Sequence, residues 1–127
     1  EAYLGISMPN FPNLFMLYGP NTNLGHNSII YMIECQVNYV VNAVQAMQAR
    51  NLTTMDVKAS KMSEFADYLK ARLSTSVWEK ECDSWYKNEA GKVTNNWPDF
   101  TYVYEQATRK VNLDDYDVSP APNHAAE

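Results

Sequence analysis

The stretch of this chain that decides its fold is FPNLFMLYGPNTNLGHNSIIYMIECQ, residues 11–36. Within it, the run LFMLY at residues 14–18 is continuously apolar and is bounded by turn residues. Such a run is typical of a strand buried on both faces of an α/β sheet, so we predict a buried strand over residues 14–18. No sequence that could form its neighbouring strands is evident nearby, and we expect those strands to lie outside these 127 residues.

A polar loop at residues 19–28, GPNTNLGHNS, follows this run and leads into a long helix predicted over residues 27–49. Asn27 or Ser28 is expected to cap the helix by accepting a backbone N–H bond. Apolar residues recur along the helix at helical spacing, and we expect this stripe to face the core. Its members are Ile33, Val37, Val40, Val44 and Met47, widened by Ile30 and Val41.

The rest of the chain is predicted to add a second amphipathic helix, a β-hairpin and a terminal helix. The second helix covers residues 59–74, after a short extended segment at residues 55–58, and its stripe is Met62, Phe65, Ala66, Leu69 and Leu73. Aromatic and β-branched residues around the loop NEAG predict a hairpin over residues 84–94. The terminal helix covers residues 99–110, and residues 119–127 are expected to be a disordered tail. The predicted fold class is therefore α+β and mainly helical.

Composition and charge exclude several classes of protein. Hydrophobic residues make up 46% and charged residues 20%, which argues against disorder. The net charge of -5 gives no electrostatic footprint for nucleic acid or for an anionic membrane. Polar residues such as Glu34 interrupt the apolar stretch at residues 29–49, so we expect no membrane span. Cys35 and Cys82 form no C-x-x-C motif and are expected to be reduced thiols in a cytoplasmic protein.

Two blocks of sequence carry a resemblance to one family. The block at residues 11–36 resembles the segment that closes the flavin domain in Baeyer–Villiger monooxygenases and related flavin-containing monooxygenases. SVWEKECDSWYKNEAGKVTNNWP, residues 76–98, resembles the family's W…C-x-SWY-hairpin-NWP pattern, and a weaker similarity follows at Tyr104, Thr108-Arg109 and Asp115-Tyr116. Two long blocks in the family's order make the resemblance specific, and it is closest in kind to the 4-hydroxyacetophenone and cyclohexanone monooxygenase group.

The resemblance implies an architecture and a set of cofactors. Residues 1–118 would be the C-terminal part of the FAD-binding domain with a C-terminal extension, and residues 14–18 would be one strand of that α/β flavin domain. The family binds FAD and NADPH through G-x-G-x-x-G turns, which let the backbone approach phosphate at a helix N-terminus. The four glycines of this chain, Gly5, Gly19, Gly25 and Gly91, form no such turn. We therefore expect the N-terminal FAD and NADP domains of the parent to be partners, and the isolated chain to bind no cofactor and to be inactive.

The resemblance also implies a set of site residues in the loop after residues 14–18. The substrate side would be lined by Asn23, Leu24, Gly25 and His26. The flavin side would be formed by Gly19, Pro20, Asn27, Ser28 and Ile29. The substrate would be a small organic ketone or a compound with an oxidisable nitrogen or sulfur centre.

From the residues alone, Asn27 and Ser28 could serve only as helix caps, and His26 could be an ordinary loop residue. No carboxylate pair suggests acid–base catalysis, and no His/Cys set has the spacing of a metal site, so no catalytic or metal-binding residue is predicted. The alternative from another class is a non-catalytic module of the same ancestry that binds a partner or self-associates into a homo-oligomer through surfaces that normally meet the flavin domain.

Overall fold

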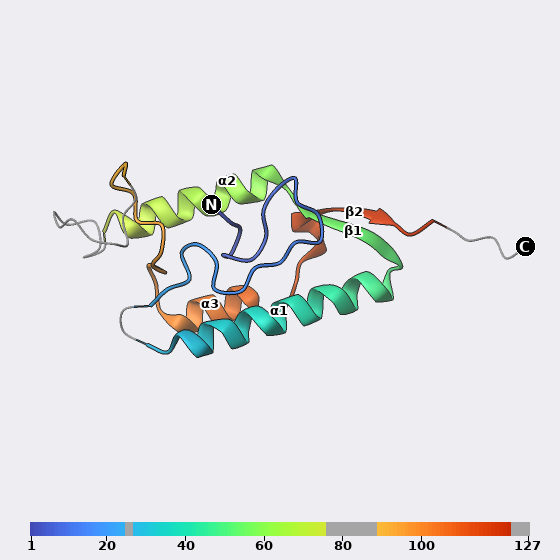
Figure 1. Ribbon diagram of the computed structural model, residues 1–127, viewed down its shortest axis with the longest axis horizontal. Helices are drawn as coiled ribbons and strands as arrows, with labels where there is room; N and C mark the ends of the chain where they lie inside the picture. Colours follow the sequence, from blue (N-terminus) through green and yellow to red (C-terminus); the bar gives the residue numbers. More distant parts are fainter. Residues whose placement is uncertain (25–26, 76–88, 123–127) are drawn as a thin grey trace, which may run out of the picture.

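The computed structural model describes residues 1–24, 27–75 and 89–122. Its elements, in chain order, are α1 (Ile29–Ala49), β1 (Leu52–Val57), α2 (Ala59–Leu73), α3 (Thr101–Thr108), the 3-10 helix η2 (Leu113–Asp115) and β2 (Tyr116–Pro120). Figure 1 shows α1 and α2 on opposite sides of the molecule, with the N-terminal segment running between them and the two strands at one end. The described residues thus form a mixed α+β structure in which helix predominates.

The first predicted helix is confirmed as α1, which begins at Ile29 and ends at Ala49. The expectation about which face it buries is wrong for most of the stripe, although Val40 and Met47 are half-buried and pack against the core. Four residues of the predicted stripe are exposed, namely Ile30 (68%), Val37 (42%), Val41 (49%) and Val44 (43%). The buried face instead consists of Met32, Cys35, Gln36, Tyr39 and Ala43.

Hydrogen bonding explains why α1 is turned in this way. The buried Gln36 donates to the Tyr104 hydroxyl (3.1 Å) and accepts from the backbone N–H of Tyr18 (2.7 Å). Tyr39 shares a hydrogen bond of 2.8 Å with the Tyr116 hydroxyl. A buried polar group costs little when it is fully hydrogen-bonded, so a glutamine and a tyrosine can occupy the core side while valines remain outside.

The strand predicted over residues 14–18 is also wrong for this chain. These residues adopt no strand, and Leu14 (40%), Leu17 (51%) and Tyr18 (48%) are exposed. Tyr18 has a left-handed backbone, with φ of 56°, which a strand does not accommodate. The apolar run predicts burial between neighbouring strands, but the one sheet among the described residues, β1–β2, does not include this segment.

The two strands pair in antiparallel fashion, with Val57 opposite Tyr116 and Leu52 opposite Pro120. Residues 55–57 of the extended segment predicted at residues 55–58 are therefore part of β1, and Lys58 is the N-cap of α2. Ordered structure continues past residue 118, because β2 ends at Pro120 and the N–H of Ala121 donates to the carbonyl of Asn51 (2.8 Å). Residues 123–127 of the predicted tail lie outside the described residues, as do residues 84–88 of the predicted hairpin.

The remaining helices follow their predictions more closely. Phe65, Leu69 and Leu73 are the buried residues of α2, and Met62 packs against the core. The terminal helix is α3 and is shorter than predicted. Trp97, which is 2% exposed, connects these helices through its ring: its centroid lies 5.0 Å from that of Tyr104 and 6.5 Å from that of Phe65. None of the described helices combines the length and the apolar character that crossing a membrane requires.

Candidate functional site

The two sequence blocks that carry the family resemblance meet in the structure. Asn21 N–H donates to the Thr94 carbonyl (2.9 Å), and Asn23 N–H donates to the Asn95 carbonyl (2.8 Å). Trp97 N–H returns a bond to the Asn23 carbonyl (2.8 Å), which completes a parallel bridge between residues 23 and 96. The loop that follows residues 14–18 is therefore held by backbone bonds to the NNWP segment, about seventy residues further along the chain.

Asparagine side chains complete this attachment. The Asn23 amide donates to Oδ1 of Asn96 (2.9 Å), and its Oδ1 accepts from the Tyr18 hydroxyl (2.9 Å). The Asn21 amide donates to the carbonyls of Val93 (3.1 Å) and Asn96 (3.2 Å). Asn21 also has φ of 58°, a conformation that asparagine tolerates better than most residues. The amide groups of both side chains are thus used within the chain, which rigidifies the loop.

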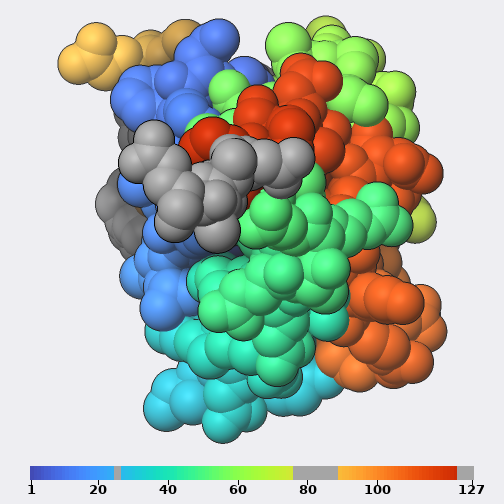
Figure 2. Space-filling model, turned by 90° about the vertical axis from the view of Figure 1, so that its right-hand side faces the viewer, coloured from blue at the N-terminus to red at the C-terminus, as the bar shows by residue number. Residues whose placement is uncertain are grey.

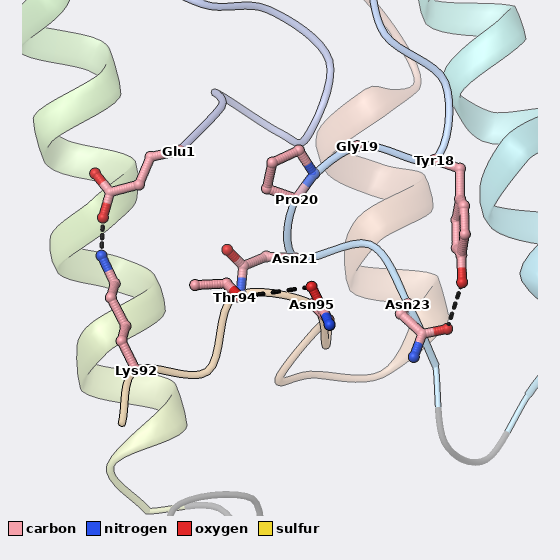
Figure 3. A pocket seen from close by; sticks show the side chains of 9 residues that line it. All are labelled: Glu1, Tyr18, Gly19, Pro20, Asn21, Asn23, Lys92, Thr94 and Asn95. Atoms are coloured by element: carbon pink, nitrogen blue, oxygen red, sulfur yellow. Dashed lines mark hydrogen bonds and ion pairs between the residues drawn. The ribbon is translucent and has the colours of Figure 1, made fainter. Parts of the chain in front are cut away.

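A cavity of about 420 Å³ lies against this loop, and Figure 3 shows its lining. On one side Glu1 and Lys92 form an ion pair, and on the other lies the Tyr18–Asn23 hydrogen bond. The full lining is Glu1, Tyr18, Gly19, Pro20, Asn21, Asn23, Lys92, Thr94 and Asn95. Its volume falls within the range of pockets that hold small molecules.

Gly19 packs closely against the backbone of Gly5. A Cβ added there would lie 2.1 Å from the Gly5 carbonyl oxygen, so no larger residue fits without moving the backbone. The Thr22 hydroxyl donates to the Gly19 carbonyl (2.7 Å) and fixes the turn from the inside. The shape of the cavity wall therefore depends on a glycine at position 19.

The start of α1 presents a second polar surface. Ser28 is the N-cap residue, but its side chain makes no cap hydrogen bond, so the predicted side-chain cap is not formed by Ser28. Asn27 accepts from the Ser28 N–H (2.8 Å) and donates to Oγ1 of Thr101 in α3 (3.2 Å). Asn27 and Ser28 are exposed and Ile29 is half-buried. A helix start without a side-chain cap presents N–H groups and a partial positive charge to any acceptor that approaches.

The predicted site residues thus fall into separate places. Gly19, Pro20 and Asn23 line the cavity, whereas Asn27, Ser28 and Ile29 lie at the start of α1. Leu24 is buried (8%) and belongs to the hydrophobic core, while Gly25 and His26 lie outside the described residues. Asn21 and Asn96 were missed, although the asparagine repeats NTN and NN in the two blocks are a pattern typical of side-chain bonds to backbone groups.

The titratable groups whose pKa is shifted serve structural roles. Burial raises the pKa of Tyr39, Tyr104 and Tyr116, so these phenols stay neutral near pH 7. Burial also raises the pKa of the Cys35 thiol, which disfavours the reactive thiolate. The hydrogen bond from Arg109 lowers the pKa of Glu105, as in an ordinary surface ion pair. Among the described residues, no group of three or more His, Cys, Asp or Glu could hold a metal ion.

Comparison with known sequences gives consistent relatives. A Baeyer–Villiger monooxygenase of Pseudomonas aeruginosa is 42% identical over 124 residues, and one of Streptomyces coelicolor is 34% identical over 125 residues. Each alignment covers 96% of this chain and 24% of the relative. An FAD-binding monooxygenase of Aspergillus niger is 38% identical over 121 residues, 91% of this chain and 20% of its own length. No family model matches the chain.

Solved structures agree in fold. A steroid monooxygenase bound to NADP superposes with a TM-score of 0.81 at 22% identity, over 94% of this chain and 23% of that one. Cyclohexanone monooxygenase from Rhodococcus sp. Phi1, bound to NADP+, gives a TM-score of 0.80 at 20% identity over the same shares of 94% and 23%. At these identities the structures establish the fold alone. The sequence relatives carry the assignment: this chain is homologous to about a quarter of the length of the Baeyer–Villiger monooxygenases and belongs to that family.

Proposed function

We propose that this chain forms one wall of the flavin and substrate site of a longer, cytoplasmic, FAD- and NADPH-dependent monooxygenase. The observation that carries the proposal is the loop at residues 19–24, which is held to Asn95 and Asn96 and leads into a helix start without a side-chain cap. The reaction would insert one oxygen atom into a ketone or oxidise a nitrogen or sulfur centre. When FAD is bound, it supplies the redox and oxygen-transfer chemistry.

The chain's own part in this function is electrostatic and positional. The N-terminus of a 21-residue helix carries about half a positive charge, and Ser28 leaves its first-turn N–H groups uncapped. This arrangement suits the negatively charged ring of a reduced flavin, which Asn27, Ser28 and Ile29 would face. Asn23 has both amide groups engaged, so we assign it the task of holding the loop in shape beside the substrate, together with Leu24, Gly25 and His26.

The isolated chain is proposed to be inactive, since it lacks the glycine turns that hold the nucleotide parts of FAD and NADPH. It spans about a quarter of the length of its relatives, and the missing FAD and NADP domains would be its partners. The second candidate function is a self-associating or binding module of the same ancestry. The exposed valines of α1 favour that alternative, because soluble monomers seldom leave an apolar helix face uncovered.

A chimaera tests the proposal. In it, this chain replaces the aligned 124 residues of the Pseudomonas aeruginosa relative. We expect the chimaera to hold flavin and to oxidise NADPH faster when a ketone is added. A folded, flavin-containing chimaera that oxidises no NADPH would refute the proposed function.

The isolated chain is the companion measurement. Titration with FAD, followed by quenching of flavin fluorescence, is expected to show no saturable binding. Steady NADPH oxidation by the isolated chain would overturn the proposal that it is inactive, and saturable FAD binding would favour the stand-alone module.

A further inference from the structure

A buried set of hydrogen bonds connects α1 to the two backbone segments that meet at the cavity wall. Gln36, which is fully buried, accepts from the backbone N–H of Tyr18 (2.7 Å) and donates to the Tyr104 hydroxyl (3.1 Å). The Tyr104 hydroxyl in turn donates to the carbonyl of Leu4 (2.6 Å). In Figures 1 and 2, the N-terminal segment and α3 lie beside α1, so these bonds can join all three. We call the set the Gln36 network.

The direction of each bond in the Gln36 network follows from the groups that form it. The Tyr104 hydroxyl has one proton, which it gives to Leu4, so it can only accept from position 36. The Tyr18 N–H can only donate, so it needs an acceptor at position 36. An amide supplies one donor and one acceptor in this arrangement, whereas a carboxylate supplies only acceptors and an apolar side chain supplies neither. The network therefore depends on the amide of Gln36.

Both ends of the network lie on strained backbone. Leu4 has φ of 54° and Tyr18 has φ of 56°, a left-handed conformation that is unfavourable for a bulky side chain. Such a conformation persists only where the surrounding contacts over-determine it. The bonds from Gln36 and Tyr104 are contacts of this kind, because they hold the Tyr18 N–H and the Leu4 carbonyl in place.

Each strained residue is followed by a glycine, and the two glycines pack against each other at the cavity wall. A Cβ added at Gly19 would lie 2.1 Å from the carbonyl oxygen of Gly5. Tyr18 and Gly19 both line the cavity, and Figure 3 shows the Tyr18 hydroxyl bonded to Asn23. By fixing the residue before each glycine, the Gln36 network sets where the two segments meet and so where this wall lies.

We propose that Gln36 is a positioning residue for the substrate side of the site, and that it acts through the backbone of Tyr18 and Gly19. This inference rests on the proposed function for the identity of the site. Gln36 belongs to α1, and the start of the same helix is the part assigned to the flavin. The network therefore fixes the cavity wall relative to that helix start, and with it the separation of substrate and flavin on which the reaction rate depends.

Two substitutions in the chimaera test the positioning. Gln36→Met keeps the length of the side chain and removes both hydrogen bonds. Tyr39→Phe is the matched control, because it removes a buried hydrogen bond on the same face of α1, to Tyr116, and neither residue lines the cavity. The probe is whichever member of a panel of cyclic and aryl ketones the native chimaera oxidises fastest.

The expected result is a change in KM that is confined to the network. KM for the ketone should rise by about tenfold or more in Gln36→Met and change by less than about twofold in Tyr39→Phe. Flavin content and the rate of NADPH oxidation without ketone should match the native chimaera in both variants. A KM for Gln36→Met that is no higher than the KM for Tyr39→Phe would overturn the proposal.

Gln36→Glu supplies a pH profile that general destabilisation would not produce. A neutral carboxyl group can donate to Tyr104 and accept from Tyr18 as the amide does, whereas its ionised form has only acceptors. Burial raises the pKa of a carboxyl group, and burial also raises the pKa of Tyr104, which stays neutral over the same range. KM in this variant should therefore be close to native at acidic pH and should rise with pH more steeply than in the native chimaera. Parallel profiles would refute the positioning role, and this variant decides alone if Gln36→Met does not fold.

Nuclear magnetic resonance of the isolated chain separates failure of this inference from failure of the proposed function. A scalar coupling across the hydrogen bond should join the amide nitrogen of Tyr18 to the side-chain carbonyl carbon of Gln36. If this coupling is present and a folded, flavin-containing chimaera oxidises no NADPH, the positioning of the wall is supported and the proposed function is contradicted. If the chimaera is active while the coupling is absent, the proposed function stands and the role of Gln36 is refuted.

Discussion

Gly19 should be the residue at which the cavity wall is least tolerant of an added methyl group. An alanine Cβ at this position would lie 2.1 Å from the Gly5 carbonyl oxygen and 3.0 Å from its carbonyl carbon. Both atoms belong to the backbone, so no rotamer change relieves the contact and the two segments must separate by roughly 1 Å or more. Overpacking of this kind costs about 1–3 kcal/mol, and we expect Gly19→Ala to lie at the upper end of that range.

Two other glycines supply the controls. Gly91 has φ of 75° and nothing within 4 Å of an added Cβ, so Gly91→Ala measures left-handed backbone strain alone, about 1 kcal/mol. Gly5 combines φ of 69° with a Cβ contact of 2.2 Å to Thr22, so Gly5→Ala should be the most destabilising of the three. The expected order of destabilisation is therefore Gly5→Ala, then Gly19→Ala, then Gly91→Ala.

Urea unfolding followed by tryptophan fluorescence gives the free energies, because Trp97 is buried in the native state. Circular dichroism checks that each variant begins from the same helical content. If Gly19→Ala costs no more than Gly91→Ala, the close packing of Gly19 on Gly5 is not present in solution. The account of the cavity wall would then have to be abandoned.

Three further predictions concern the loop, the helix start and the core. Asn23→Ala leaves the buried Asn96 amide oxygen without its donor. The free energy of unfolding, measured by urea titration, should therefore fall by about 1–3 kcal/mol. If it does not fall, the Asn23–Asn96 hydrogen bond contributes nothing to stability. Ser28→Asp should cap α1 and raise the free energy of unfolding of the isolated chain by about 0.5–1 kcal/mol. In the chimaera, the same substitution should weaken flavin binding, because it places a negative charge at the start of α1. The control, Ala59→Asp at the start of α2, should leave flavin binding unchanged. Equal flavin affinity for both acidic variants would contradict a flavin at the start of α1. Burial raises the pKa of Tyr39, so the contribution of this phenol to stability is complete below its unfolded-state pKa of about 10 and is lost as the pH rises above that value. Tyr39→Phe should therefore reduce the fall in melting temperature at alkaline pH. If the fall is unchanged in this variant, other groups cause it.

The periodicity of apolar residues predicted the helices well where the helix packs against residues of this chain. The helical stripe of Phe65, Leu69 and Leu73 predicted both the extent of α2 and its buried face. The extent of α1 was predicted equally well, because helical periodicity depends on neighbours in sequence. The pairing of β1 with β2 was not predicted, since it joins segments about sixty residues apart and no local pattern encodes that contact.

The residues that line the cavity could be predicted only in part, again because contacts between distant segments form it. The family resemblance selected Gly19, Pro20 and Asn23, all of which line it. The opposite wall is formed by Lys92, Thr94, Asn95 and the N-terminal residue Glu1. The hydrogen bonds that join the two walls are made by individual asparagine side-chain amides. Such bonds depend on geometry that periodicity and composition do not contain.

Two of the expectations that the structure overturned were wrong in the same direction, and that shared direction is informative. The run at residues 14–18 and the apolar stripe of α1 were both predicted to be buried, and in both places more than half of the side chains are exposed. The two segments are neighbours in the structure, since Tyr18 N–H donates to Gln36 of α1 and Phe15 and Val44 line one shallow cavity. Hydrophobic patterning reflects the environment in which a sequence functions, so both segments carry the composition of a larger core than these residues form by themselves. If docking onto the rest of the monooxygenase covers them, slow amide hydrogen exchange should extend over residues 14–18 in the chimaera, where the isolated chain exchanges quickly. Equal exchange in the two proteins would mean that the apolar pattern has another cause.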